Sequence, residues 1–300
     1  MSILGLIAAF GGGIFGAAIG GMPSFILAGT IAMIGSILSC AGITGISELM
    51  VNNLAFGPFL APPVAFLGGV AASAYAASKG KTENGADVAT ALNVLASPDV
   101  LFVGGIFGMI GYVVSSVAGM VFGPIIPFAT DNGGFAVFWV GIVVRFVFGK
   151  RGLLSAPEKR SVLSKDGVLG NTILISLGYS IAVSGVYCML APTYADQLNS
   201  YHFIIFGLAA LGLIFAEFGQ AFFGWHHIGI ISAEAVMAGY GATGNVGTAM
   251  IMGIIFGVVA GIIGDFAGCY INTDVDTHID PPACAIWILT IVINVVAFLL

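Results

Sequence analysis

The chain has 300 residues, of which 59% are hydrophobic and only 7% are charged, and its mean hydropathy is +1.09. Soluble domains carry about 25% charged residues and disordered chains are polar, so both classes are excluded. The net charge of −6, from 8 basic and 14 acidic residues, leaves no basic face for nucleic acid. The composition predicts an all-α polytopic integral membrane protein embedded in a lipid bilayer.

Apolar runs long enough to cross a bilayer recur along the whole chain. A bilayer core needs about 20 apolar residues in a helix, and this rule predicts about ten spans. The runs lack the in–out alternation of a membrane β-barrel. Two of them, 133–149 and 228–241, are short enough to be re-entrant or broken. The predicted spans are 3–22, 24–44, 58–78, 99–123, 133–149, 170–191, 202–223, 228–241, 246–269 and 283–300.

The basic residues predict an orientation in the membrane. Lys79 and Lys81 follow the third span, and the other six lie at the end of the fifth span or in segment 150–169. The positive-inside rule places both stretches in the cytoplasm. Both termini are then outside, in what we expect to be a prokaryotic plasma membrane. Segment 150–169 links a first membrane half, 1–149, to a second, 170–300.

Two parts of the halves resemble each other and suggest an internal repeat. The run from Phe15 aligns with the run from Phe218 with one gap, and 66–80 then aligns with 254–268. This alignment has an offset of six spans, which predicts parallel repeats, whereas one re-entrant segment would make them inverted. Many transporters are built from such repeats, with the substrate site near the bilayer midplane.

Glycine and proline indicate how the helices pack. The 45 glycines are about twice the usual share, and many stand three or four residues apart. Small residues at that spacing let helices approach closely, although a glycine-lined pore or hinge is the alternative. The number of such stripes also predicts a symmetric homo-oligomer. Pro62 and Pro63 fall inside the third span, where they should kink or interrupt the helix.

Three carboxylates lie within apolar runs of the second half: Glu217, Glu234 and Asp265. A charge at membrane depth is costly and indicates function, so the three favour a proton or cation pathway. Each could instead be a neutral, hydrogen-bonded helix contact. His226 and His227 precede Glu234 by eight and seven residues, which allows one imidazole to share its helix face. A histidine paired with Glu234 in this way would relay protons or bind a transition metal. The alternative is an ordinary polar pair at the membrane interface.

Segment 272–280 has an oxygen- or nitrogen-bearing side chain at every second residue. In an extended chain these side chains point to one side, and D-x-D spacing can wrap a hard cation. The expected cofactor is therefore a bound cation: Na⁺, Ca²⁺ or a transition metal. The alternative is a solvated acidic loop whose last aspartate caps the final helix, with Pro281 at the first helical position. The five candidate ligands are Asn272, Asp274, Asp276, His278 and Asp280.

The functional expectation is transport. Nucleotide-binding, nucleophile-elbow, H-E-x-x-H and paired C-x-x-C motifs are missing from the sequence, so we expect no enzyme and assign no catalytic residue. The sequence favours a secondary transporter or permease for a small solute or ion, coupled to protons or cations through buried carboxylates. The alternatives are a passive channel and a non-transporting membrane subunit that anchors partner proteins through segment 150–169.

Overall fold

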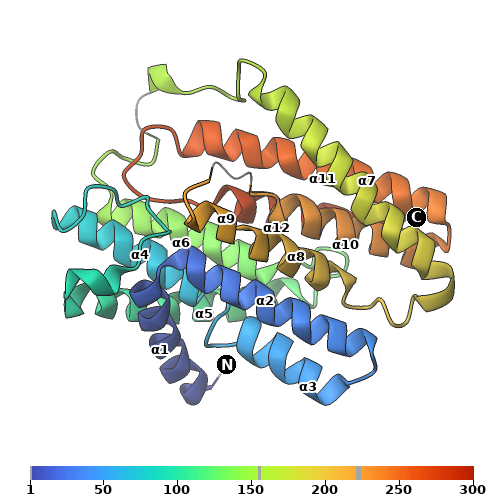
Figure 1. Ribbon diagram of the computed structural model, residues 1–300, viewed down its shortest axis with the longest axis horizontal. Helices are drawn as coiled ribbons and strands as arrows, with labels where there is room; N and C mark the ends of the chain where they lie inside the picture. The colour runs from blue at the N-terminus through green and yellow to red at the C-terminus, as the bar shows by residue number, and fades with distance from the viewer. Residues whose placement is uncertain (1, 155–156, 221–223) are drawn as a thin grey trace.

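The computed structural model describes residues 2–154, 157–220 and 224–300. Within these ranges every regular element is a helix, which confirms the predicted all-α class (Figure 1). Five helices are long and apolar enough to cross a membrane, and four shorter helices are also apolar. The architecture is therefore compatible with a multi-pass membrane protein.

The described helices form two halves in chain order. The first half contains α1 (Ile3–Ile19), α2 (Gly21–Cys40), α3 (Thr44–Glu48), the π-helix η1 (Leu49–Ala55), α4 (Ala65–Ser78), the 3₁₀ helix η2 (Leu92–Leu95), α5 (Pro98–Phe122) and α6 (Asn132–Phe148). After the 3₁₀ turn η3 (Pro157–Lys159), the second half contains α7 (Val168–Tyr194), α8 (Tyr201–Gly212), α9 (Ile214–Glu217), α10 (His226–Thr243), α11 (Val246–Phe266), the π-helix η4 (Ala267–Ile271) and α12 (Pro281–Leu299).

Each half contains a group of three helices packed on one another. In the first half α1 packs on α4 and α5, and in the second half α7 packs on α10 and α11. Two helix pairs make the main contacts between the halves: α2 lies against α8, and α6 lies against α12. In Figure 1 the blue-to-green first half and the yellow-to-red second half meet along these pairs.

The third predicted span differs from the observed helix. The chain turns through 58–64, and α4 begins only at Ala65, directly after Pro62, Pro63 and Val64. The predicted interruption by the two prolines is therefore confirmed. Residues 44–55, which lie almost wholly outside the predicted spans, form α3 and η1 and fold back against α2.

Helices α6 and α12 run antiparallel, and the segment that precedes each of them lies beside the other helix. At one end of the pair, Thr130 Oγ1 donates a hydrogen bond to the Trp287 carbonyl at 2.7 Å, and Gly134 lies close to Ala283. At the other end Arg145, near the end of α6, binds Thr277, which precedes α12. Two helix starts therefore meet in the interior of the bundle.

Aspartate caps determine where these two helices begin. Asp131 accepts a hydrogen bond from the backbone N–H of Gly134, and Asp280 accepts one from Ala283 at 2.7 Å. Such caps satisfy N–H groups that have no partner within the first turn of a helix. Pro281 occupies the first helical position, where an N–H would have no intrahelical partner in any case. The predicted cap at Asp280 is confirmed.

Glycines lie where helices touch most closely. Gly104 of α5 packs on Gly13 of α1, and Gly111 faces the backbone carbonyl of Pro63, just before α4. A side chain at either position would overlap backbone atoms that cannot move independently. These contacts support the close-packing interpretation of the glycine spacing at both positions.

We expect Gly111→Ala to destabilise the bundle. The added methyl group would overlap the Pro63 carbonyl and push α5 away from α4, and overpacking of this kind costs about 1–3 kcal/mol. Gly178, in the middle of α7, has open space around its Cβ position, so Gly178→Ala is the matched control. Thermal unfolding in detergent, followed by tryptophan fluorescence, should show a lower midpoint only for Gly111→Ala. Equal midpoints for the two variants would contradict the packing argument.

Candidate functional site

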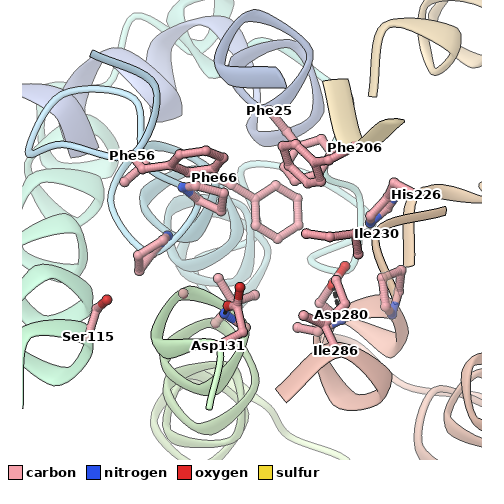
Figure 2. A pocket seen from close by; sticks show the side chains of 18 of the residues that line it. Phe25, Phe56, Phe66, Ser115, Asp131, Phe206, His226, Ile230, Asp280 and Ile286 are labelled. Atoms are coloured by element: carbon pink, nitrogen blue, oxygen red, sulfur yellow. Dashed lines mark hydrogen bonds between the residues drawn. The ribbon is translucent and has the colours of Figure 1, made fainter. Parts of the chain in front are cut away.

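A cavity of about 500 Å³ lies where the starts of α6 and α12 meet (Figure 2). Residues from both halves of the chain line it, and α2, α5, α6, α8, α10 and α12 all contribute. Cavities of this size are typical of sites for small organic ligands. The lining includes a group of polar side chains: Asn52, Ser115, Asp131, Asn132, His226, His278 and Asp280.

Phenylalanine rings form one wall of the cavity. Figure 2 shows Phe25, Phe56, Phe66 and Phe206 on the side opposite Asp131 and Asp280. The Phe25 ring meets the Phe66 ring with centroids 5.9 Å apart and the Phe206 ring at 5.3 Å, both edge to face. These rings come from α2, α4, α8 and the segment after η1, so the wall forms only when the two halves pack together.

The opposite wall is acidic. The carboxylates of Asp131 and Asp280 lie at the first turns of α6 and α12, because each side chain caps its own helix. The second oxygen of Asp280 lies 3.2 Å from His278 Nε2, which also lines the cavity. Capping therefore explains why these two carboxylates lie inside the bundle.

The two adjacent histidines of α10 point in different directions. His226 lines the cavity, is 8% exposed, and packs on the Phe25 ring at a centroid distance of 4.8 Å. His227 instead packs against Gly264 of α11, since neighbouring helical residues are about 100° apart. Neither is hydrogen-bonded to Glu234, which accepts a hydrogen bond from Thr290 Oγ1 of α12 at 2.8 Å. Of these two histidines, therefore, only His226 lines the cavity.

The three carboxylates predicted to form a pathway lie in three separate environments. Glu234 joins α10 to α12 through Thr290. Asp265, near the end of α11, accepts hydrogen bonds from the backbone N–H of Ser164, at 2.8 Å, and from its hydroxyl. Glu217 ends α9. Only Glu234 belongs to a helix that lines the cavity, so the three do not form a single row.

The alternating segment before α12 does not form a ring of metal ligands. Asp274 pairs with Arg151 at 2.6 Å and with Lys159 at 3.2 Å, and Asp276 accepts from the backbone N–H of Lys150. Asp274 has a φ of 54°, so the chain turns there and the alternation of an extended strand is lost. Within residues 2–154, 157–220 and 224–300, no three His, Cys, Asp or Glu side chains are placed to hold a metal ion.

Asp274 lies in a loop outside the helices, and its surroundings favour the charged form. The hydrogen bond from Lys159 and the charge of Arg151 lower the pKa of the Asp274 carboxyl. A lowered folded-state pKa means that the pairing stabilises the fold above the usual carboxyl range. That contribution is lost as the pH falls through the lowered value. The pair is solvent-exposed, so its effect on overall stability is small.

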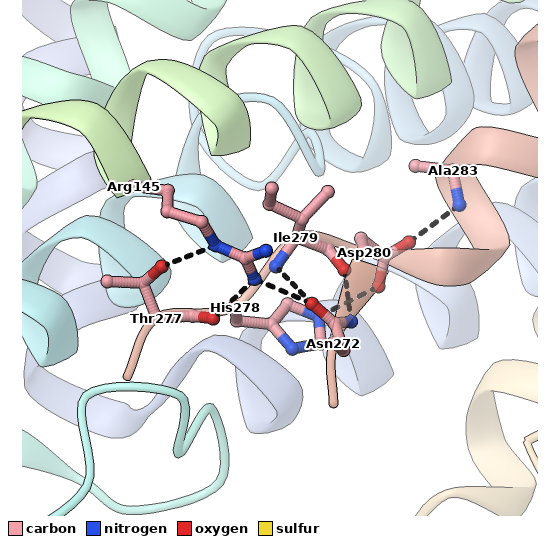
Figure 3. A network of polar contacts seen from close by, with 7 residues as sticks. All are labelled: Arg145, Asn272, Thr277, His278, Ile279, Asp280 and Ala283. Carbon is pink, nitrogen blue, oxygen red and sulfur yellow. Dashed lines mark hydrogen bonds and ion pairs between the residues drawn. The ribbon is translucent and has the colours of Figure 1, made fainter. Parts of the chain in front are cut away.

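Arg145 is the structural residue that sequence reasoning missed (Figure 3). Its side chain is 1% exposed, and its guanidinium donates to four groups that precede α12 and to one carbonyl that follows α6. The network fixes the approach of the chain to Asp280 and thereby positions that carboxylate at the cavity. The acceptors are the Thr277 hydroxyl at 2.9 Å, the Thr277 carbonyl at 2.8 Å, the Asn272 amide oxygen at 2.7 Å, and the carbonyls of Ile271 at 2.6 Å and Leu153 at 3.0 Å.

Sequence signals for the missed residues did exist. Arg145 stands inside a predicted span, at 133–149, whereas a residue that only sets the orientation would lie beyond the span. Asp131 stands just before that span in the same way that Asp280 stands before the last one. Reading both as caps would have predicted two equivalent helix starts, although not that they meet.

Comparison with known proteins identifies a family. The profile of a family described as "Family of unknown function (DUF7973)" matches residues 1–163 and 178–299. No curated protein and no solved structure matches the chain. Because the matched residues cover most of the sequence, the protein belongs to this family of unknown function, DUF7973.

Proposed function

We propose that this protein is a secondary transporter that carries a small solute or ion across a membrane, with the cavity between α6 and α12 as its binding site. The observation that carries the proposal is the position of the cavity at two helix starts, one from each half. Transporters commonly bind their substrates at such discontinuities, near the midplane, between structural repeats.

We further propose that the chain is a duplication of five helices rather than a repeat with an offset of six. Helices α1, α2, α4, α5 and α6 then correspond to α7, α8, α10, α11 and α12. The packing supports this: α2 lies on α4 as α8 lies on α10, and α6 lies on α4 and α5 as α12 lies on α10 and α11. The main contacts between the halves, α2 with α8 and α6 with α12, each join a helix to its own counterpart, as expected for helices that lie beside a two-fold axis.

Corresponding residues of α5 and α6 and of α11 and α12 stand at one spacing and support the same register. Gly104 of α5 faces Ala17 of α1, and Gly253 of α11 faces Ser184 of α7. The glycines are 149 residues apart, as are the capping residues Asp131 and Asp280. The same spacing separates Arg145, which binds the segment before α12, from Asn294, which donates to the Ala129 carbonyl before α6 at 2.9 Å.

An offset of five crossing helices would place the repeats in opposite orientations. If all ten helices cross the membrane, each helix of the second unit runs opposite to its counterpart, and the antiparallel pair α6 and α12 fits this arrangement. Inverted repeats give a transporter two related states, open to opposite sides, around one fixed site. The proposal therefore includes alternating access to the cavity.

We assign the coupling role to Glu234. Its carboxyl group lies on α10 and is held by the Thr290 hydroxyl, and no ion pair to it is found within the described residues. A carboxyl group with a hydroxyl partner can exchange a proton without breaking a salt bridge. It would therefore couple solute movement to a proton gradient.

Counterflow in proteoliposomes tests this function. Vesicles that contain the purified protein and an unlabelled solute should take up the labelled solute faster than vesicles that contain the protein but no internal solute. We expect this for at least one member of a panel of amines, amino acids, sugars and carboxylates. A channel would give uptake without this acceleration. Glu234→Gln should preserve counterflow but abolish accumulation driven by a proton gradient. Wild-type accumulation in this variant would overturn the coupling role.

We also propose that segment 150–169 is cytoplasmic and that both termini are outside. The Lys150 ammonium donates to the Ser78 carbonyl at 3.0 Å, so the two basic stretches lie at the same end of the molecule. The positive-inside rule then applies to that end as a whole. On a cysteine-free background, Ser161→Cys in intact cells should resist an impermeant maleimide until the membrane is opened. Labelling in intact cells would reverse the orientation.

A further inference from the structure

We propose that the cavity binds a small organic ammonium cation, with its charge beside Asp131 and Asp280 and its apolar part against the phenylalanine wall. The inference rests on the proposed function and specifies its substrate class. It draws on four features of the cavity: its aromatic wall, its charge, an unpartnered histidine and its size.

The aromatic wall favours a cation. The faces of phenylalanine rings carry partial negative charge and attract ammonium groups within about 6 Å of the ring centroid, most strongly when water is excluded. Phe25, Phe66 and Phe206 are each at most 8% exposed and line the same cavity. An apolar solute would also pack here, so the aromatic wall alone does not decide the charge of the ligand.

The charge of the opposite wall decides it. None of the described residues that line the cavity is Lys or Arg, and two of them are aspartates. Each aspartate faces a helix start, which is equivalent to roughly +0.5 of an elementary charge. With both carboxylates ionised and with His226 and His278 neutral, two carboxylates against two helix starts leave roughly one negative charge uncompensated. That remainder suits a single positive charge and opposes an anion.

An unpartnered histidine indicates a missing ligand. His226 is 8% exposed and lines the cavity, and its Nδ1 atom has no hydrogen-bond partner in the structure. Figure 2 shows its side chain between Phe206 and Asp280 at one end of the cavity. A buried polar atom without a partner is costly unless a ligand or water satisfies it. A hydroxyl or N–H group of a bound organic cation would do so.

The size of the cavity separates an organic cation from a bare ion. A volume of about 500 Å³ far exceeds the space of one cation, and the described residues contain no cluster of three side chains placed to hold a metal ion. A molecule with a charged head and a short apolar or hydroxylated part fits both walls at once.

Thermal shift measurements on the full-length protein in detergent test the assignment, with choline as the probe. Its uncharged isostere, 3,3-dimethylbutan-1-ol, is the matched ligand control. Choline should raise the unfolding midpoint in a saturable manner, and the isostere should not. Asp131→Asn, which keeps a capping side chain, should weaken choline binding at least tenfold. Asp196→Asn, at an exposed position outside the cavity, should bind choline like the wild type.

A second variant keeps the test decisive if Asp131→Asn fails to fold. Phe206→Leu retains an apolar side chain but removes the ring, and it should weaken choline binding several-fold. Equal shifts with choline and its isostere would overturn the inference, as would wild-type choline binding by either cavity variant. So would the absence of any shift with choline, tetramethylammonium and putrescine.

The failure of this inference is distinguishable from the failure of the proposed function. Counterflow of an uncharged or anionic solute, without choline binding, would keep the transporter and reject its cation selectivity. Choline binding that depends on Asp131, without counterflow of any amine, would keep the site and reject transport.

Discussion

Arg145→Met should destabilise the protein by several kcal/mol, because it removes a fully buried hydrogen-bond donor. The guanidinium donates to five acceptors, and four of them belong to the segment that precedes α12. Each buried acceptor left without a donor costs about 1–3 kcal/mol. Methionine keeps an unbranched stem about as long as the apolar part of arginine, but it lacks the guanidinium and donates nothing, so the loss reports mainly on the hydrogen bonds.

Two further variants show whether the hydrogen bonds of Arg145 cause this loss of stability. Arg145→Lys keeps the charge but loses the planar fork, and it should recover only part of the stability. Arg151→Met removes an exposed arginine that pairs with Asp274, and it should melt close to the wild type. Thermal unfolding in detergent measures all three. A wild-type midpoint for Arg145→Met would show that the network does not hold the segment before α12.

The second large effect is expected at the aspartate caps. Asp131→Asn and Asp280→Asn should each reduce solute uptake at least tenfold while leaving the unfolding midpoint nearly unchanged. Asparagine caps a helix about as well as aspartate, so these substitutions remove the charge and keep the cap. Alanine at the same positions should lower both uptake and stability, since loss of a cap costs about 0.5–2 kcal/mol.

Asp99→Asn provides the matched control for uptake. Asp99 also stands in the first turn of a helix, but it pairs with Lys81 at 2.7 Å and does not line the cavity. Its variant should transport like the wild type in proteoliposomes. If Asp131→Asn and Asp280→Asn also transported like the wild type, the two carboxylates would be caps only and the cavity would not be the binding site.

The sequence predicted what depends on composition and local chemistry. Continuous apolar runs predict membrane helices, Pro62 and Pro63 predict an interruption, and the aspartate before Pro281 predicts a cap. Each of these depends on residues that are neighbours in the chain. The structure agrees at the level of helix type, the interruption and the cap.

The candidate site depends on contacts between distant segments, which local patterns do not contain. Asp131 and Asp280 line the same cavity because α6 and α12 pack on each other, and the aromatic wall gathers rings from three helices and one connecting segment. The alternation of 272–280 predicted that the polar side chains share one face. The chain turns at Asp274, and the hydrogen bond from Arg145 holds Asn272, so these side chains do not converge. Glycine-rich sequences also align by chance in several registers, which is why the packing, and not the alignment, supports a five-helix repeat.

Access to the cavity from both sides of the membrane tests the central claim most directly. Ser115 of α5 lines the cavity, so Ser115→Cys, with the four native cysteines replaced, places a thiol inside it. Ile110→Cys, an exposed position on the same helix, is the lipid-facing control. An impermeant maleimide added outside right-side-out vesicles reaches one face of the membrane, and added outside inverted vesicles it reaches the other. We predict that it labels Ser115→Cys in both preparations and Ile110→Cys in neither. Labelling of Ser115→Cys from one side only, or from neither, would show that the cavity is not on a transport path.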